Sequence, residues 1–189
     1  DNSYLSNMLL GGAFHFNDLD HHDSGDFSYR LIAGFGEDEP IETHSADFSS
    51  INYGIIMYQK TGLVFHYLKD YLGDDKFNQV MQTYFETWKF KHPQPEDMRK
   101  VCEEVTGEDL SWLFNDLIQT TNHIDYKITK VKKTVYGTAV TVKNKGQVSG
   151  PIGVDLISDD KIIESQWSTA YTKKATLNFK TIVDFDWAS

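Results

Sequence analysis

The chain has 189 residues, a formal net charge of -10 and a hydrophobic share of 40%, which is enough apolar material for one good core or two small ones. It contains no run of about 18 apolar residues, so we expect no membrane-spanning helix. No basic-then-apolar leader follows Asp1, so we expect no signal peptide.

The charge changes sign along the chain. Residues 1–125 carry 22 acidic and 8 basic side chains, a net charge of -14, whereas residues 126–189 carry 6 acidic and 10 basic ones, a net charge of +4. This break predicts two units with separate surfaces. The acidic first unit makes nucleic acid a poor partner, because phosphate binding requires clustered Lys and Arg.

The first fifty residues give an irregular pattern. Residues 3–16 favour one short helix, interrupted by Gly11 and Gly12, and residues 17–27 and 33–50 are rich in the Gly, Asp and Ser of turns and loops. A loop of this length within a compact domain is usually functional or packs against another body.

Four helices are expected next. The first covers residues 52–73 and ends at Gly73, and the second is capped by Asp74 or Asp75. The third begins near Pro95 and stops at Gly107, and a fourth starts at Asp109. The apolar positions expected to face the core are Met57, Val64, Leu68 and Tyr71 in the first helix, Phe77, Val80, Met81, Tyr84, Phe85 and Trp88 in the second, and Leu110, Leu113, Phe114, Leu117 and Ile118 in the fourth. The first helix places Lys60, Lys69 and Asp70 off its apolar stripe.

After residue 120 the apolar spacing becomes two, and β-branched residues dominate. Turns are expected at Gly137 and at Asp159-Asp160, with one or two further strands over residues 173–187. The expected fold class is therefore multi-domain α plus β, with a helical part over residues 1–124 and a β-sandwich over residues 125–189, either complete or with its last strand cut short.

A loose cluster of metal-ligand residue types lies near the beginning: His15, Asp18, Asp20, His21, His22, Asp23 and Asp26. Its spacing matches neither H-E-x-x-H nor a calcium-binding loop, so we interpret it as a solvated acidic loop. His44, His66, His92 and His123 are scattered. Cys102 lies within a helical pattern and is expected to be an inert buried thiol.

A series of short motifs follows in order over residues 57–118: Tyr58-Gln59-Lys60 at a helix opening, Leu72-Gly73 at its end, the helix from Phe77 to Tyr84, the helix containing Asp97, and the stretch from Gly107 to Phe114 with the sequence GEDLSWLF. This series resembles the C-terminal part of the catalytic domain of M1-family zinc aminopeptidases, which are gluzincin metallopeptidases. The β region that follows resembles the immunoglobulin-like domain found after that catalytic domain. Thr61-Gly62 departs from the family, which has Gly followed by a small residue, and the family's H-E-x-x-H and downstream glutamate do not occur.

The resemblance implies a role for Tyr58. In such peptidases two His and one Glu hold zinc, a glutamate takes a proton from water, and the tyrosine donates a hydrogen bond to the oxyanion of the tetrahedral intermediate. Tyr58 is the catalytic candidate, and Tyr53 is a candidate for lining the same cleft. Lys60 is expected to support local structure, and Tyr67 and Tyr71 are assigned to packing. From the residues alone, the core reading is favoured for Tyr58, because a tyrosine on an aromatic helix is usually an amphipathic core residue.

The resemblance therefore predicts a piece of a larger peptidase, inactive by itself, with peptide as the parent's substrate and the missing upstream half as its partner. Zinc is expected in the parent and not in this chain. The alternative is a non-catalytic peptide- or protein-binding scaffold module with the same architecture. Substrate preference, exo- or endopeptidase action, oligomeric state and compartment stay open, with a secreted or periplasmic parent among the alternatives.

Overall fold

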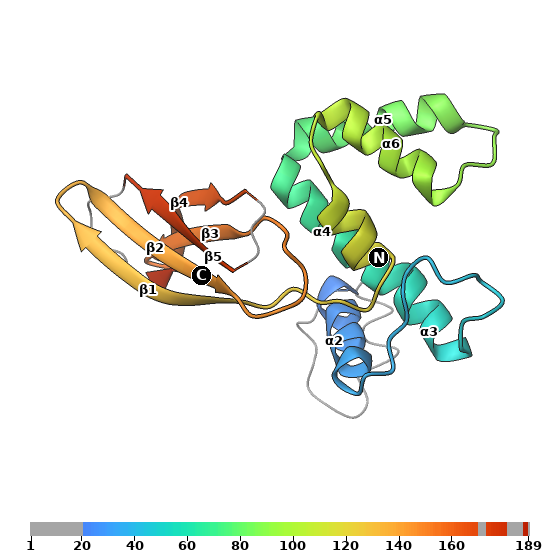
Figure 1. Ribbon diagram of the computed structural model, residues 1–189, viewed down its shortest axis with the longest axis horizontal. Helices are drawn as coiled ribbons and strands as arrows, with labels where there is room; N and C mark the ends of the chain where they lie inside the picture. Colours follow the sequence, from blue (N-terminus) through green and yellow to red (C-terminus); the bar gives the residue numbers. More distant parts are fainter. Residues whose placement is uncertain (1–20, 170–172, 181–186, 189) are drawn as a thin grey trace. The chain divides into compact units, whose positions relative to one another are not determined.

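The computed structural model describes residues 21–169, 173–180 and 187–188, which form helices followed by antiparallel strands (Figure 1). Two compact units are distinguished: the segment that ends at Tyr67 together with Ile118–Thr121, and Leu68–Leu117 together with the chain from Asn122 onward. The mixed α and β composition is as expected. None of the described helices is both long and apolar enough to cross a membrane.

The first unit begins with helix α2 (His21–Gly34), a region where a loop was expected. That expectation was wrong, since composition is a weak guide where tertiary contacts decide. Two features support the helix: an ion pair of 2.7 Å joins Arg30 Nε to Asp26 Oδ2 four residues earlier, and α2 packs against the π-helical segment η1 (Ile55–Lys60) (Figure 1). The short helix expected at residues 3–16 lies outside the described residues.

The long helix around the tyrosines is built from three successive pieces. Helix α3 (Ser50–Gly54) is capped by Ser49 and leads into η1, which continues as α4 (Thr61–Leu72). The loop expected over residues 33–50 is confirmed only between Phe35 and Ser49, because its two ends belong to α2 and α3.

The buried stripe of this helix recurs every four residues: Asn52, Ile56, Lys60, Val64 and Leu68. In a regular α-helix a spacing of four drifts around the axis, because one turn holds 3.6 residues. The wider i→i+5 turn of η1 counters that drift and keeps the stripe on one side. Val64 and Leu68 are buried as expected. At the start of the stripe the expectation was wrong, since Ile56 is buried and Met57 only half-buried, and Lys60 lies on the stripe and not off it.

The second unit contains α5 (Asp74–Trp88), α6 (Pro95–Thr106) and the π-helical η2 (Trp112–Ile118), of which Ile118 belongs to the first unit. Helices α5 and α6 lie side by side (Figure 1). Gly73 ends the preceding helix as expected. It is also the N-cap of α5, so Asp74 and Asp75, which were expected to cap this helix, lie inside its first turn. Pro95 and the left-handed Gly107 bound α6 as expected.

The two expected apolar faces have different outcomes. All five residues expected on the face of the fourth helix, Leu110, Leu113, Phe114, Leu117 and Ile118, are buried. On α5 only Val80 is buried, and Phe85 remains 63% exposed.

Six strands follow in two antiparallel sheets. One has the order β1 (Tyr126–Thr134), β2 (Gly137–Asn144) and β5 (Lys174–Phe179), and the other has the order β4 (Lys161–Trp167), β3 (Gly153–Ser158) and β6 (Trp187–Ala188). Both expected turns are found. Asp159 and Asp160 have positive φ, as a two-residue hairpin turn requires, and Gly137 has φ of 135°.

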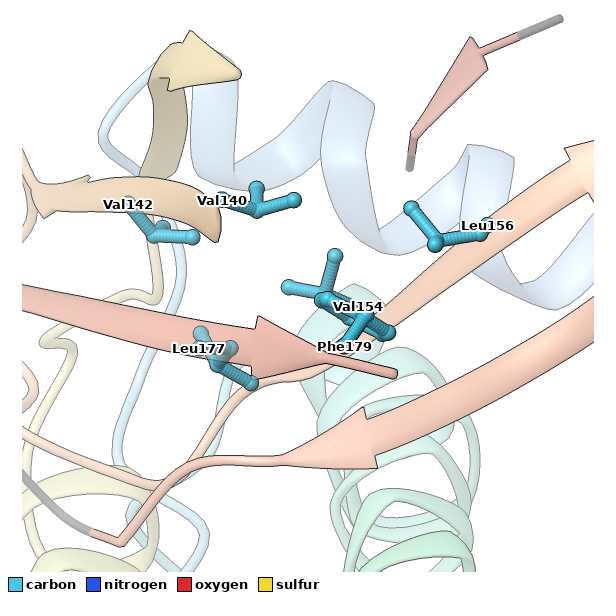
Figure 2. Packing of buried hydrophobic residues seen from close by; sticks show 6 residues of the cluster. All are labelled: Val140, Val142, Val154, Leu156, Leu177 and Phe179. Carbon is cyan, nitrogen blue, oxygen red and sulfur yellow. The ribbon is translucent and has the colours of Figure 1, made fainter. Parts of the chain in front are cut away.

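One hydrophobic core joins the two sheets. Figure 2 shows its buried side chains, which come from β2, β3 and β5: Val140, Val142, Val154, Leu156, Leu177 and Phe179. These residues alternate along their strands, so the side chains between them point to the opposite face of each sheet.

Candidate functional site

Tyr58 lies in η1 and its side chain is 67% exposed. Two residues later, Lys60 is only 1% exposed. Residues two apart on a helix point to nearly opposite sides, so the burial of Lys60 directs Tyr58 outward. A π-helical turn inside an α-helix is frequent at functional sites, and here it contains the candidate tyrosine. The reading of Tyr58 as a core residue does not fit its exposure.

Tyr53 lies beside Tyr58. Their ring centroids are 6.4 Å apart at an interplanar angle of 76°, and Tyr53 in turn contacts Phe48 at 6.2 Å and 82°. Both are edge-to-face contacts of the kind that aromatic rings prefer. The structure therefore brings the two candidate tyrosines together on one exposed aromatic surface, with Tyr53 43% exposed.

Lys60 is held by three oxygen atoms from two segments of the chain. Its Nζ donates to Asp38 Oδ2 at 3.4 Å, to the Glu39 carbonyl at 3.1 Å and to the Thr120 carbonyl at 3.3 Å. It also lies 5.6 Å from the centre of the Tyr29 ring. The expectation that Lys60 supports local structure is confirmed.

Burial dominates the electrostatics of this lysine. It lowers the pKa of Lys60, and the neighbouring Asp38 carboxylate opposes that effect. Burial together with the Asp38 charge raises the pKa of Tyr29 to about 12, so that phenol stays neutral beside the ion pair. The three donated hydrogen bonds use all the hydrogens of an ammonium group, as a buried charge requires.

Asn52 makes a second attachment to the same loop. Its amide Nδ2 donates to the Glu37 carbonyl at 2.7 Å, and its backbone N–H is capped by Ser49 Oγ at 3.2 Å. Asn52 and Lys60 are two turns apart on the buried side of the helix. Together they bind residues 37–39, so the helix backbone that carries Tyr58 is attached to this loop on its buried side.

Sequence reasoning missed Asp38 and Asn52 as parts of this arrangement. Asp38 was counted only among the acidic residues of a loop, and Asn52 only as the beginning of the helix. The available signal was the spacing of four that relates Asn52, Ile56 and Lys60, which places two polar residues on an otherwise apolar side.

The residues present do not fit a zinc ion. Among the described residues, no group of three His, Cys, Asp or Glu side chains is placed to hold a metal. Of the early His/Asp cluster, His15, Asp18 and Asp20 lie outside the described residues, and Asp26 forms the ion pair with Arg30. His44 accepts a hydrogen bond from the Ala46 backbone at 3.2 Å. We therefore derive no chemical step through zinc.

A cavity of about 650 Å³ lies at the junction of α4 and α5, in the second unit. Neither Tyr53 nor Tyr58 contributes to it. Its lining residues are Leu72, Gly73, Asp74, Asp75, Lys76 and Gln79.

Residues 29–117 match the model of the Peptidase family M1 domain. The matched segment begins in α2, includes Tyr53, Tyr58 and Lys60, and ends in η2. The resemblance read from the ordered motifs is thus confirmed: this segment is related to the metallopeptidases of family M1.

Individual relatives agree with that class. The chain is 31% identical to Aminopeptidase M1-D of Oryza sativa subsp. japonica over 80 residues, and 31% identical to Aminopeptidase M1-C of the same organism over 100 residues. These alignments cover 41% and 51% of this chain. The chain spans only 9% and 11% of the length of those two relatives.

Proposed function

We propose that this chain contributes a hydrogen-bond donor, the phenol of Tyr58, to the active site of an M1-type zinc aminopeptidase. The observation that carries the proposal is an exposed Tyr58 on a helix anchored by Lys60, inside the segment that matches the family. Tyr53 would line the same cleft, because its ring packs edge-to-face on that of Tyr58.

The proposed chemistry follows from what a phenol can do. Attack of water on a peptide carbonyl gives a tetrahedral intermediate whose oxygen carries negative charge, and a hydroxyl group can donate a hydrogen bond to it. Loss of one such donor costs about 3–4 kcal/mol of transition-state stabilisation. A donor helps most when it is already oriented, which is the role we assign to the buried attachments beneath Tyr58.

Zinc enters this proposal only through the family resemblance. The ion, its His and Glu ligands and the glutamate base would come from outside the described residues, and the described chain alone would be inactive. Peptide would be the substrate of the assembled enzyme.

We also propose the finer architecture that the resemblance implies, with residues 1–124 as the helical part of a catalytic domain and residues 125–189 as an immunoglobulin-like sandwich. Two antiparallel sheets over one shared core support this assignment.

The test compares this chain with a longer form that includes the peptidase segment upstream. Zinc content and hydrolysis of aminoacyl-arylamides are measured for both. We expect activity only in the longer form, where Tyr58→Phe lowers kcat by about 10²–10³-fold with little change in KM. Tyr136→Phe is the control, because Tyr136 is also an exposed tyrosine, at 89%. Equal kcat in Tyr58→Phe and Tyr136→Phe would remove Tyr58 from the mechanism.

A second function is favoured by one observation on α2 (His21–Gly34) and on Phe35, the residue that follows it. Phe27, Leu31 and Phe35 recur every four residues and are 64%, 48% and 71% exposed. Such a stripe suits a non-catalytic module that binds a peptide or a protein. Stoichiometric peptide binding without turnover in the longer form would select this function over the enzyme.

A further inference from the structure

The outward face of the sheet formed by β1, β2 and β5 carries a row of lysines. In the register of the two strand pairs, Lys127 is opposite Lys143, and Lys143 is opposite Lys174. Directly opposed residues have Cβ atoms about 5 Å apart, and like charges in that position destabilise a sheet. Three successive strands therefore place lysines directly opposite one another, and all three residues are exposed.

A β-bulge adds two more lysines to this face. The register of β1 shifts between Ile128 and Lys130, so that one residue is left over in the pairing with β2. Ile128 is then paired with Val142, and Val131 with Val140, both of which are core residues. Lys130 and Lys132, on either side of Val131, therefore point outward. Without the extra residue, alternation would turn Lys130 and Lys132 toward the core.

Within β1, β2 and β5 no acidic side chain balances this face. The three strands contain no Asp or Glu, and residues 126–145 hold six lysines. The five lysines of the outward face, Lys127, Lys130, Lys132, Lys143 and Lys174, form no ion pair with a described residue. We refer to these five residues as the lysine face.

Protection of a sheet edge does not explain the lysine face. Lysines on an edge strand discourage pairing with another chain, and β1 is an edge strand. Lys143, however, lies on β2, the central strand, where no edge is open. Its position between two other lysines has a cost in stability that an anionic partner would remove.

The tip of the β1–β2 hairpin indicates which anionic partner fits. Val135 and Tyr136 are 78% and 89% exposed at the turn. An aliphatic and an amphipathic aromatic side chain beside lysines is the combination that enters the headgroup region of a lipid bilayer. Single-stranded nucleic acid would require aromatic rings on the sheet face, and the outward positions between the lysines hold Thr141 and Thr176 instead.

We propose that the lysine face and the hairpin tip bind the surface of a membrane that contains anionic lipids. Peripheral binding of this kind needs no spanning helix. It is independent of the aminopeptidase assignment, since it uses neither Tyr58 nor any metal.

The test is co-sedimentation of the full chain with vesicles of phosphatidylcholine alone and of phosphatidylcholine with about 30 mol% phosphatidylserine. We expect binding only to the anionic vesicles, and loss of that binding at about 0.5 M NaCl. Lys143→Glu should weaken binding about 25-fold, because it changes the charge by two and each unit contributes about fivefold. The same change should leave thermal stability equal or higher, since a carboxylate then lies between two lysines.

Lys161→Glu is the matched control, because Lys161 is an exposed lysine of the other sheet. It should leave binding unchanged, while Tyr136→Ser should weaken binding because it removes an aromatic ring from the hairpin tip. The proposal is overturned by equal binding to both vesicle types, by no binding at all, or by equal losses in Lys143→Glu and Lys161→Glu. If a single-stranded oligonucleotide at equal charge concentration displaced the vesicles completely, the partner of the lysine face would be a nucleic acid and not a membrane.

Discussion

Lys60 and Asp38 form a buried ion pair in which Nζ lies 3.4 Å from Oδ2 and the side chains are only 2% and 8% exposed. Lys60 → Met would leave the Asp38 carboxylate buried without its cation, so we expect a loss of about 3–5 kcal/mol in the free energy of unfolding. Urea denaturation measures this loss. Restoring neutrality in the double variant Lys60→Met with Asp38→Leu should recover part of it.

Lys69 and Asp74 give the matched control for that prediction. Their atoms approach to 3.2 Å, but the side chains are 40% and 76% exposed. Lys69→Met should therefore change stability by less than about 1 kcal/mol. Similar losses in Lys60→Met and Lys69→Met would show that burial of the first pair has no energetic consequence.

Tyr71 is expected to make the free energy of unfolding fall as the pH becomes alkaline. Burial raises the pKa of Tyr71 to about 12, with a further contribution from its hydrogen bond of 2.6 Å to Glu108. A pKa that is raised on folding gives stability that is complete below the unfolded value near 10 and is lost as pH rises toward about 12. Tyr71→Phe should flatten the fall in unfolding free energy over this window. An unchanged slope between pH of about 10 and 12 would contradict it.

Gly137 is required where the β1–β2 hairpin turns. Its φ is 135°, and a Cβ placed there would lie 2.1 Å from the Phe179 carbonyl oxygen. Gly137→Ala should cost at least about 2 kcal/mol, because both backbone strain and a clash with a neighbouring strand oppose it. Gly62→Ala is the control, since Gly62 is helical and has open space around it. That change should stabilise the protein by about 0.5–1 kcal/mol, and thermal unfolding of the two variants would show opposite shifts.

Cys102 should be unreactive in the folded protein. It is fully buried on α6, and burial raises the pKa of its thiol to about 12, so almost no thiolate exists at neutral pH. We expect an aromatic disulfide reagent to react with it at the rate of unfolding, and rapidly in denaturant. Fast reaction without denaturant would show that α6 opens locally.

The sequence predicted features that depend on local chemistry. Pro95 begins α6 because its ring fixes its own φ, and Gly107 ends it because glycine readily adopts a left-handed φ. The turn at Asp159-Asp160 likewise depends on the φ angles of those two residues. The five apolar positions from Leu110 to Ile118 are buried because they share one side of a helical turn.

Features that depend on distant contacts were not predictable in this way. Helix α2 forms in a segment of turn-favouring composition because it packs against η1. The burial of Lys60 depends on oxygen atoms of Asp38, Glu39 and Thr120, which no helical period reveals. The candidate site was thus predictable at Tyr58 and Tyr53 through a family pattern, and its anchoring was not.

The attachments of Asn52 and Lys60 also have a consequence for motion. The loop at residues 37–39 has no regular secondary structure, yet its carbonyls are bound by two side chains of the neighbouring helix. Glu42 N–H continues the connection to the Ile118 carbonyl at 3.3 Å. The loop can open only if the helix gives up hydrogen bonds at the same time, so the two should exchange their amide hydrogens as one cooperative unit. We then expect this loop to be as slow in amide exchange as the helix to which it is bound, which is the helix that carries Tyr58.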